Sequence, residues 1–311
     1  MVEWKKTTLE KCTDILGDGL HGTPKYTEGG EYAFINGNNL VNGEILIKKD
    51  TKRVDYSQYE KYKKPLTNRT LLVSINGTLG NVGMYNSEKI ILGKSACYFN
   101  VKEFVDKDFI YYVVSSPIFR QYLEHSATGT TIKNISLKQM REYDFLLPPI
   151  EEQKQISSVL KMIDEKIKNN RRVNENLEQQ AQAIFANMFD ESNTTQATIS
   201  DVSLNVTDGV HNTVHDDPEG EYLLLSCKNI KGGSLNIGTS ERRISRDTFE
   251  KLRRRTKLSK GDVLISSVGT IGELLLLNNE PLNYEFQRSV AMVKPNPSVV
   301  SSAYLYESLL S

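Results

Sequence analysis

The chain has 311 residues, of which 38% are hydrophobic and 25% are charged, and its formal net charge is zero. This length suits two domains of ordinary size with a connector, and the composition is that of a soluble globular protein. No apolar run approaches the ~20 residues that a membrane span needs, and the first ten residues contain no apolar core of a signal peptide. A neutral chain is not a uniformly basic nucleic-acid binder, but it can carry a basic face.

The three cysteines, Cys12, Cys97 and Cys227, are far apart and lack C-x-x-C spacing. Their odd number and scatter predict a reducing environment and a cytoplasmic protein. The same pattern argues against a disulfide framework and against a zinc site.

One pattern occurs twice. Residues 18–21 (DGLH) recur as residues 208–211 (DGVH), and the run at 72–80 (LVSINGTLG) recurs at 264–272 (LISSVGTIG). The motifs keep their order and their spacing drifts little, so the sequence predicts a duplicated domain rather than a solenoid of short repeats.

Each copy reads as a mixed α/β module. Short strands are expected at residues 32–35, 43–47, 71–75 and 90–92, with a helix over 108–123 that Pro117 interrupts. The second copy matches them with strands at 222–226 and 263–267 and a helix at 302–310.

The second copy is shorter than the first. If Ser289 matches Ser95, then Ser311 falls opposite Pro117, and completion would need a segment equivalent to the rest of the first copy. We expect a chain truncated within its second module; the alternative is a natural fold that ends there.

A long helix is expected between the copies. Pro148 and Pro149 suit a helix start, and Glu151 and Glu152 complement the dipole of its first turn. A heptad seam follows, which is typical of a coiled coil roughly 58 Å long. Its members are Ile156, Leu160, Ile163, Ile167, Asn170, Asn174, Leu177, Ala181, Ile184 and Met188.

Asn170 and Asn174 interrupt this seam at its middle. A buried asparagine in a coiled coil fixes register or partner choice at a cost in stability. The alternative is that both lie at a bend or are half exposed. A seam of this length needs a partner in water, so we expect the helix to pair with another chain, as in a homodimer.

Both copies carry a basic segment at the matching place. Residues 48–69 contain eight lysines and arginines against three acids, and residues 241–260 contain nine against three. A single charge run is usually a solvated face, whereas two at equivalent positions favour contact with DNA phosphates. Tyr56, Tyr59 and Tyr62 interleave with the first run, where packing beneath the loop competes with a contact to sugar or base.

Two kinds of turn are further candidates. The Gly-Thr-x-Gly turns at 77–80 and 269–272 follow apolar strands, and glycines with a hydroxyl and free N–H groups can hold a phosphate. A tight structural turn is the alternative. The Asp-Gly-x-His turns present polar side chains, and the copies diverge just after them, which suits modules that read different sequences.

The predicted DNA contacts of the first copy are His21, Thr23, Lys25, Asn39, Lys52, Arg53, Lys63, Lys64, Ser74, Asn76, Thr78, Lys94, Thr130 and Lys133. Those of the second copy are His211, Lys228, Asn229, Arg253, Arg254, Arg255, Ser266, Thr270 and Arg288.

No catalytic motif is found. The run 93–95 (GKS) resembles the end of a P-loop, but Glu88 stands where the first glycine is required. His211 and His215 have i,i+4 spacing in a turn-rich stretch without HExxH, which argues against a metal. Leu147 precedes the two prolines, so the Asn-Pro-Pro-Tyr loop of an amino-methyltransferase is missing. The chain is therefore expected to be a non-catalytic binding subunit.

Residues 146–156 (LLPPIEEQKQI), which lead into the heptad helix, resemble the junction in specificity subunits of type I restriction-modification systems. Residues 129–135 (GTTIKNI), the opening at 17–24 (GDGLHGTP) and the two Ser-x-x-Gly-Thr-x-Gly turns are similar to that family as well. The resemblance covers the whole chain, and the junction is its most specific element.

This resemblance implies two α/β target-recognition domains in tandem, at 1–148 and 191–311, separated by a coiled-coil spacer helix at 149–190. Each domain would read one half of a bipartite site in double-stranded DNA. The helix would set the spacing and dock methyltransferase subunits, and ATP-dependent restriction subunits would join the complex. The chain itself would bind no cofactor, because S-adenosylmethionine, ATP and magnesium would belong to its partners.

Two other readings stay open. One is a DNA-recognition fragment of a fused restriction-methylation enzyme, which a catalytic loop upstream of Met1 would reveal. The other is a structural coiled-coil scaffold, which leaves the paired basic segments unexplained.

Overall fold

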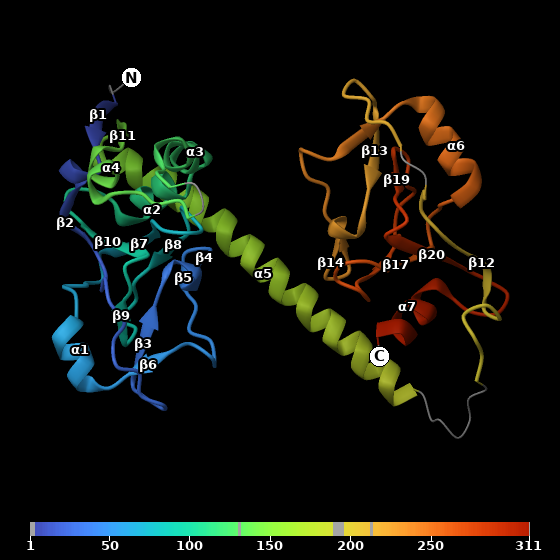
Figure 1. The fold of residues 1–311 in the computed structure, drawn as a ribbon, viewed down its shortest axis with the longest axis horizontal. Helices are drawn as coiled ribbons and strands as arrows, with labels where there is room; N and C mark the ends of the chain where they lie inside the picture. Colours follow the sequence, from blue (N-terminus) through green and yellow to red (C-terminus); the bar gives the residue numbers. More distant parts are fainter. Residues whose placement is uncertain (1–3, 130–131, 189–195, 212–213, 311) are drawn as a thin grey trace. The chain divides into compact units, whose positions relative to one another are not determined.

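The structure is a computed structural model, and it describes residues 4–129, 132–188, 196–211 and 214–310. The chain divides into two compact units, Met1–Asn170 (unit 1) and Arg171–Ser311 (unit 2), with the boundary inside the long helix. Both units mix strands and helices (Figure 1). This confirms the predicted mixed α/β class with a long helix between two modules.

The main sheet of unit 1 is antiparallel, in the order β2 (Thr13–Asp18), β10 (Ala96–Val101), β7 (Thr70–Ser74) and β8 (Val82–Met84). Every residue of β7 and β10 is buried, because both faces of these strands are covered. A second sheet has the order β6 (Arg53–Val54), β3 (Tyr32–Ile35) and β9 (Ile90–Leu92), in which β3 and β9 are parallel. The hairpin β4 (Leu40–Val41) and β5 (Glu44–Ile45) and the helix α1 (Tyr56–Tyr62) complete this part.

Three helices and a strand pair belong to the core beside the main sheet. The helices are α2 (Lys107–Ser115), α3 (Pro117–Ser126) and α4 (Leu137–Glu142), and β1 (Lys5–Thr8) pairs with β11 (Asp144–Leu147). Ser116 ends α2 and caps α3, with its hydroxyl accepting from Phe119 N, and Pro117 occupies the first turn of α3. The predicted interruption at Pro117 is confirmed.

Unit 2 repeats the strand order of unit 1. Its main sheet is β12 (Ser203–Asp208), β20 (Val290–Pro295), β17 (Val263–Ser266) and β18 (Leu274–Leu276). Its second sheet is β16 (Arg242–Ile244), β13 (Tyr222–Leu225) and β19 (Tyr284–Phe286), again with the last two parallel. The hairpin β14 (Ile230–Lys231) and β15 (Ser234–Leu235), the helix α6 (Arg246–Thr256) and the helix α7 (Ser302–Leu310) follow the same plan. The sequence repeat is therefore a repeat of the fold.

Equivalent apolar positions of the two units differ in burial. Leu9 and Leu16 are 0% and 9% exposed in unit 1, where Leu9 N donates to Tyr143 O and the Arg141 guanidinium donates to Leu16 O. Their equivalents in unit 2, Ile199 and Val206, are 38% and 51% exposed. In unit 1 the segment that contains α4 and β11 covers these positions.

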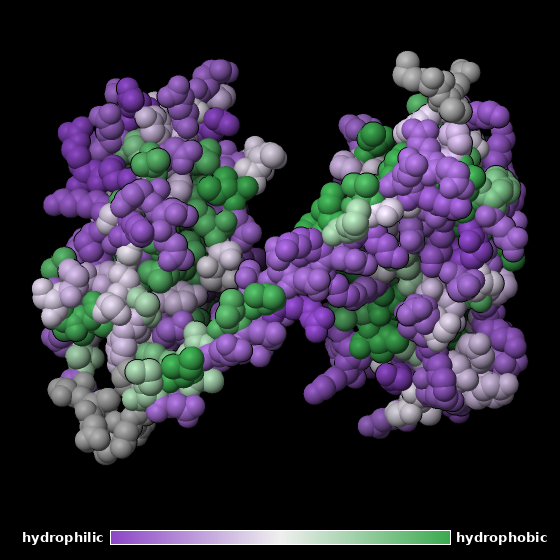
Figure 2. Space-filling model, turned by 180° about the vertical axis from the view of Figure 1, so that it is seen from behind, coloured by the Kyte–Doolittle hydropathy of each residue, from purple (hydrophilic) through white to green (hydrophobic). Residues whose placement is uncertain are grey.

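The long helix is α5 (Ile150–Met188), which starts after the two prolines as predicted. The seam residues Ile163, Ile167, Leu177, Ile184 and Met188 are between 43% and 73% exposed. Green apolar side chains interrupt a largely hydrophilic surface along this helix (Figure 2). Among the described residues, no helix is long and apolar enough to cross a membrane.

Candidate nucleic-acid interface

Three turns of unit 1 come together at one end of its sheets. The Asp-Gly-x-His turn follows β2 and forms a parallel bridge from Leu20 to Gly93, in the turn after β9. The third turn, after β7, joins them because Ile75 N donates to Ser95 O at 3.0 Å. A Cβ added to Gly19 would lie 2.3 Å from Leu92 O, so only glycine permits this approach. The motifs that recur in both copies thus come together in unit 1 as one cluster of three turns, after β2, β7 and β9, which we call the three-turn cluster.

Unit 2 builds the same cluster with the same bonds. Val210 N donates to Phe286 O, and Ser267 N donates to Ser289 O. A Cβ on Gly209 would lie 2.1 Å from Phe286 O, which repeats the constraint at Gly19. The backbone of the three-turn cluster is therefore shared by the two units.

A histidine and an aspartate are paired in each cluster. His21 Nε2 lies 2.6 Å from Asp18 Oδ2, and His211 pairs with Asp208 in the same way. The Asp208 carboxylate also accepts from Arg255 at 2.9 Å. The carboxylate orients an exposed imidazole whose second ring nitrogen is available to a ligand.

Each cluster also presents one exposed cation at the equivalent position, Lys94 in unit 1 and Arg288 in unit 2. A hollow of about 340 Å³ lies beside the first; its lining residues are Asp18, His21, Ile75, Asn76, Lys94, Asn134, Ile135, Ser136 and Leu137. A hollow of about 380 Å³ lies beside the second; its lining residues are Val210, His211, Val214, Leu224, Arg242, Gln287 and Arg288. Each hollow combines basic and amide side chains on a partly apolar floor, which suits the edge of a base beside a phosphate.

The serines of the Ser-x-x-Gly-Thr-x-Gly turns have structural partners. Ser74 Oγ accepts from Asn81 N at 2.8 Å, and Ser266 Oγ accepts from Glu273 N at 2.8 Å. Both serines are buried, whereas Thr78 and Thr270 at the turn tips are exposed. The hydroxyl that a ligand can reach in each turn is therefore that of the threonine.

Some basic side chains of the first basic segment (residues 48–69) bond to other groups of the protein, and others are exposed. Arg53 donates to Gly30 O at 3.3 Å and Lys63 pairs with Glu60 at 2.8 Å, while Lys52 is exposed. The ring of Tyr59 stacks on Tyr32 with a centroid distance of 4.0 Å, so Tyr59 packs α1 against β3.

The second basic segment divides in the same way. Arg253 pairs with the fully buried carboxylate of Glu285 and also donates to Pro281 O and Tyr284 O. Burial raises the pKa of Glu285, and the hydrogen bond and charge of Arg253 oppose that rise. Arg254, the next residue of α6, is exposed. Arg254 is thus free for a phosphate where Arg253 supports the fold.

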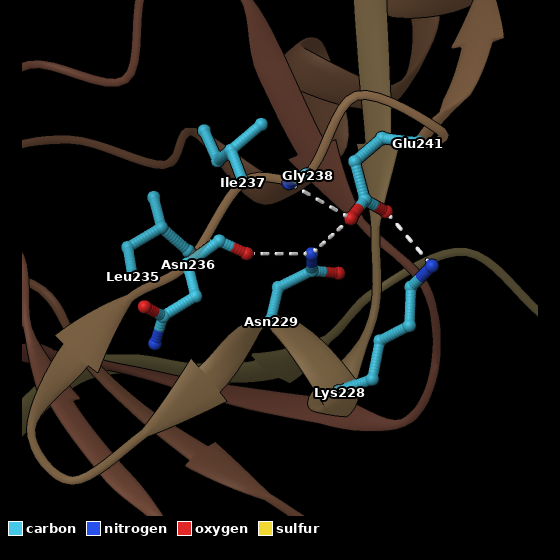
Figure 3. A pocket seen from close by; sticks show the side chains of 7 residues that line it. All are labelled: Lys228, Asn229, Leu235, Asn236, Ile237, Gly238 and Glu241. Atoms are coloured by element: carbon cyan, nitrogen blue, oxygen red, sulfur yellow. Dashed lines mark hydrogen bonds and ion pairs between the residues drawn. The ribbon is translucent and has the colours of Figure 1, made fainter. Parts of the chain in front are cut away.

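Asn39 and Asn229 hold the short hairpins. Asn39 Nδ2 donates to Leu46 O at 3.0 Å, and Asn229 Nδ2 donates to Asn236 O at 2.9 Å and to Glu241 Oε1 at 2.8 Å. In unit 2 these groups line a pocket of about 530 Å³, where Lys228 Nζ pairs with Glu241 Oε2 at 2.9 Å (Figure 3). The Glu241 carboxylate ties the turn together and neutralises Lys228.

Of the remaining predicted contacts, some have a partner within the protein and others are exposed. Asn76 Nδ2 donates to Asn134 Oδ1 at 3.1 Å, and Lys64 lies 6.0 Å from the ring centroid of Tyr98. Thr130 lies outside the described residues. Predicted contacts with exposed side chains also include Thr23, Lys25 and Lys133.

Sequence reasoning missed several residues that line the hollows. Asp18, Asn134, Arg242 and Gln287 were not among the predicted contacts, although they lie beside His21, His211 and Arg288. A residue-by-residue alignment of the two copies gives a signal for one of them, because it sets Gln287 against Gly93 in otherwise equivalent turns.

No group of three or more potential metal ligands occurs among the residues that the structure describes.

Comparisons with known proteins agree with the geometry. The family described as "Type I restriction modification DNA specificity domain" matches residues 1–179. The chain is 22% identical over 306 residues to the type I restriction enzyme EcoBI specificity subunit of Escherichia coli, covering 86% of this chain and 63% of that protein. It is 25% identical over 195 residues to the MjaIX specificity subunit of Methanocaldococcus jannaschii, covering 60% of this chain and 44% of that protein.

The fold is that of a solved relative. The crystal structure of a type I restriction-modification system S subunit from M. genitalium aligns with a TM-score of 0.56 at 19% identity, covering 99% of this chain and 77% of that one. The chain thus spans between 44% and 63% of the length of the two curated relatives named above. Since the family match covers more than half of the sequence, the chain belongs to the type I restriction-modification DNA specificity family.

Proposed function

We propose that this chain is a non-catalytic, sequence-specific DNA-binding subunit of a type I restriction-modification complex. Each unit reads one half of a bipartite site in duplex DNA, and α5 sets the distance between the halves. The observation that carries this proposal is the duplicated three-turn cluster, in which His21 and Lys94 are matched by His211 and Arg288. Exposed cations beside a polar hollow supply phosphate contacts and base readout together.

Methyltransferase subunits are the proposed partners of α5, and ATP-dependent restriction subunits complete the assembly. S-adenosylmethionine, ATP and magnesium belong to those partners in this proposal. The relatives are named as specificity subunits, which supports a role in recognition rather than in chemistry. The division into recognition domains at 1–148 and 191–311 with a spacer at 149–190 is part of the same proposal.

The test is a selection from random duplex DNA with this chain bound to its methyltransferase subunits. We expect enrichment of a bipartite motif, with an affinity that falls steeply as salt rises because phosphate contacts release counterions. A folded complex that enriches no motif would contradict the proposal and favour a coiled-coil scaffold.

A second arrangement is supported by the exposed seam of α5. Two copies that pair through Ile163, Ile167 and Leu177 would present two first units and read a symmetric site. In the same selection this arrangement gives a palindromic motif. Sedimentation of the chain alone, and of a variant with Ile163→Lys and Ile167→Lys, measures whether that face holds a dimer together.

A further inference from the structure

The two clusters share a backbone but differ beside the cation. Gly93 N donates to Ile35 O at 2.8 Å in unit 1, and Gln287 N donates to Leu225 O at 2.8 Å in unit 2. The residue that donates this backbone hydrogen bond therefore has no side chain in unit 1 and a long amide side chain in unit 2.

In unit 1 a side chain at this position would displace its neighbours. A Cβ on Gly93 would lie 2.2 Å from Asn36 Oδ1 and 2.9 Å from Phe34 Cζ. Phe34 in turn contacts Tyr26, with ring centroids 5.8 Å apart. The Asn36 amide and the Phe34 ring thus lie against Gly93, and Tyr26 lies against Phe34.

Unit 2 has smaller residues at each of these places. Phe34 is replaced by Leu224, Asn36 by Ser226 and Tyr26 by Asp216. Of these three residues, Leu224 lines the hollow of about 380 Å³, together with Gln287 and Arg288. The smaller residues at positions 224 and 226 leave space beside the backbone that carries the Gln287 side chain.

The walls of this hollow are rich in hydrogen-bond donors. Arg242 donates to Asp216 Oδ1 at 2.6 Å and to Val214 O at 2.7 Å, which fixes its guanidinium in place. Among the described residues, none forms a hydrogen bond or ion pair with the side chains of Gln287 or Arg288. The Arg242 guanidinium is therefore held in place beside the unpaired side chains of Gln287 and Arg288. Together these groups can donate hydrogen bonds to a ligand that is rich in acceptors.

We propose that Gln287 and Arg288 are the specificity-determining residues of unit 2, and that they read purine edges in the major groove of the DNA site. Guanine offers O6 and N7 as paired acceptors for an arginine fork, and adenine offers the donor and acceptor that match a glutamine amide. Unit 1 lacks this reader and presents Lys94, which contacts an acceptor as a point charge without a fork. This inference rests on the proposed function and assigns its readout in unit 2.

Two variants give unit 2 the residues of unit 1. Gln287→Gly removes the amide, and Arg288→Lys keeps the charge but removes the planar fork. Both residues are tolerated at the equivalent place in unit 1, so both variants are expected to fold, and thermal unfolding checks this. Arg254→Ala is the matched control, because Arg254 is an exposed cation of unit 2 that does not line the hollow.

The experiment is the DNA selection with the methyltransferase complex, repeated with each variant. We expect discrimination at one or two purine positions of a single half-site to fall by about 5- to 150-fold, while the other half-site keeps its motif. Arg254→Ala should weaken binding to all sequences alike. If both variants enrich the unchanged motif, the assignment is wrong while the proposed function stands; if the native complex enriches no motif, both are wrong.

Discussion

The side-chain amide of Gln153 joins the start of α5 to the start of α2, because its Oε1 accepts from Asp106 N at 2.9 Å. Its Nε2 donates to Pro148 O at 2.7 Å, and the residue is 2% exposed. Asp106 itself caps α2, with its carboxylate accepting from Phe109 N. One buried amide thus links the start of the long helix to the cap of α2.

Replacement of this amide should loosen that junction. Gln153→Ala leaves a backbone N–H and a carbonyl without partners, which costs about 1–3 kcal/mol for each buried group. We expect a lower denaturation midpoint for unit 1 in chemical unfolding followed by the fluorescence of Trp4, the one tryptophan of the chain. Gln155→Ala, on the exposed side of α5, is the control and should leave the midpoint unchanged.

When the ion pair between Arg253 and Glu285 is removed by mutation, the stability of unit 2 should depend on pH. Arg253→Met leaves the Glu285 carboxylate buried without its cation, at a cost of about 3–5 kcal/mol near neutral pH. Because burial raises the pKa of Glu285, the folded state holds the proton more tightly than the unfolded chain does. The variant should be most stable in acid and should lose stability as the pH rises through the folded-state pKa.

Thermal unfolding of Arg253→Met between about pH 4.5 and pH 8 measures this dependence. Adding Glu285→Gln removes the charge and should recover part of the loss at the upper end of that range. A midpoint that rises with pH in the single variant would contradict the assignment.

Glycine at position 19 should be required for the three-turn cluster. Gly19→Ala forces a Cβ against the carbonyls of Leu92 and Gly93, so the turns must separate. We expect weaker DNA binding and faster amide exchange in the turn after β9, measured by hydrogen-exchange mass spectrometry. Gly22→Ala, where a Cβ would meet nothing within 4 Å, should behave as the native chain does.

Equivalent apolar positions should differ in their contribution to stability. Leu9→Ala removes a fully buried side chain and should destabilise unit 1 by about 2–5 kcal/mol. Ile199→Ala removes a side chain that is 38% exposed and should therefore cost less. Amide hydrogen-exchange rates in the two units measure both losses of stability. Equal losses would show that Ile199 is covered in solution.

The packing around Gly93 should appear as a coupling free energy. Gly93→Gln alone places a side chain against Asn36 and should destabilise unit 1, whereas Asn36→Ser alone should cost little more than its lost hydrogen bond from Ser95. The double variant should be more stable than the sum of the two changes predicts, by about 0.5–3 kcal/mol. Additive losses would mean that Asn36 is not the obstacle.

Much of the fold follows from the sequence because it depends on short-range patterns. The heptad spacing after Pro149 predicted α5, Pro117 predicted the break between α2 and α3, and the repeated motifs predicted that strand order would recur. Each of these features is set by residues within one turn, one strand or one helix.

The roles of single side chains were less accessible, because they depend on partners far along the chain. Arg253 belongs to a basic run, but its role follows from Glu285 on a neighbouring strand. Ser74 was expected to face a ligand, and its hydroxyl instead closes its own turn. The hollow of unit 2 was not predicted, because its lining residues, such as Val210, Leu224 and Gln287, lie far apart in the sequence and only the folded chain brings them together.

The crowding at Gly93 also limits the order in which one module can change into the other. In unit 1, glutamine at position 93 would displace Asn36, whereas serine at position 36 would leave more space beside Gly93. A mutational path toward the arrangement of unit 2 is therefore expected to cost less stability when residue 36 shrinks before a side chain is added at position 93. On the proposed readout, the intermediate on that path would have glycine at position 93 beside smaller neighbours, and this position would contact no base.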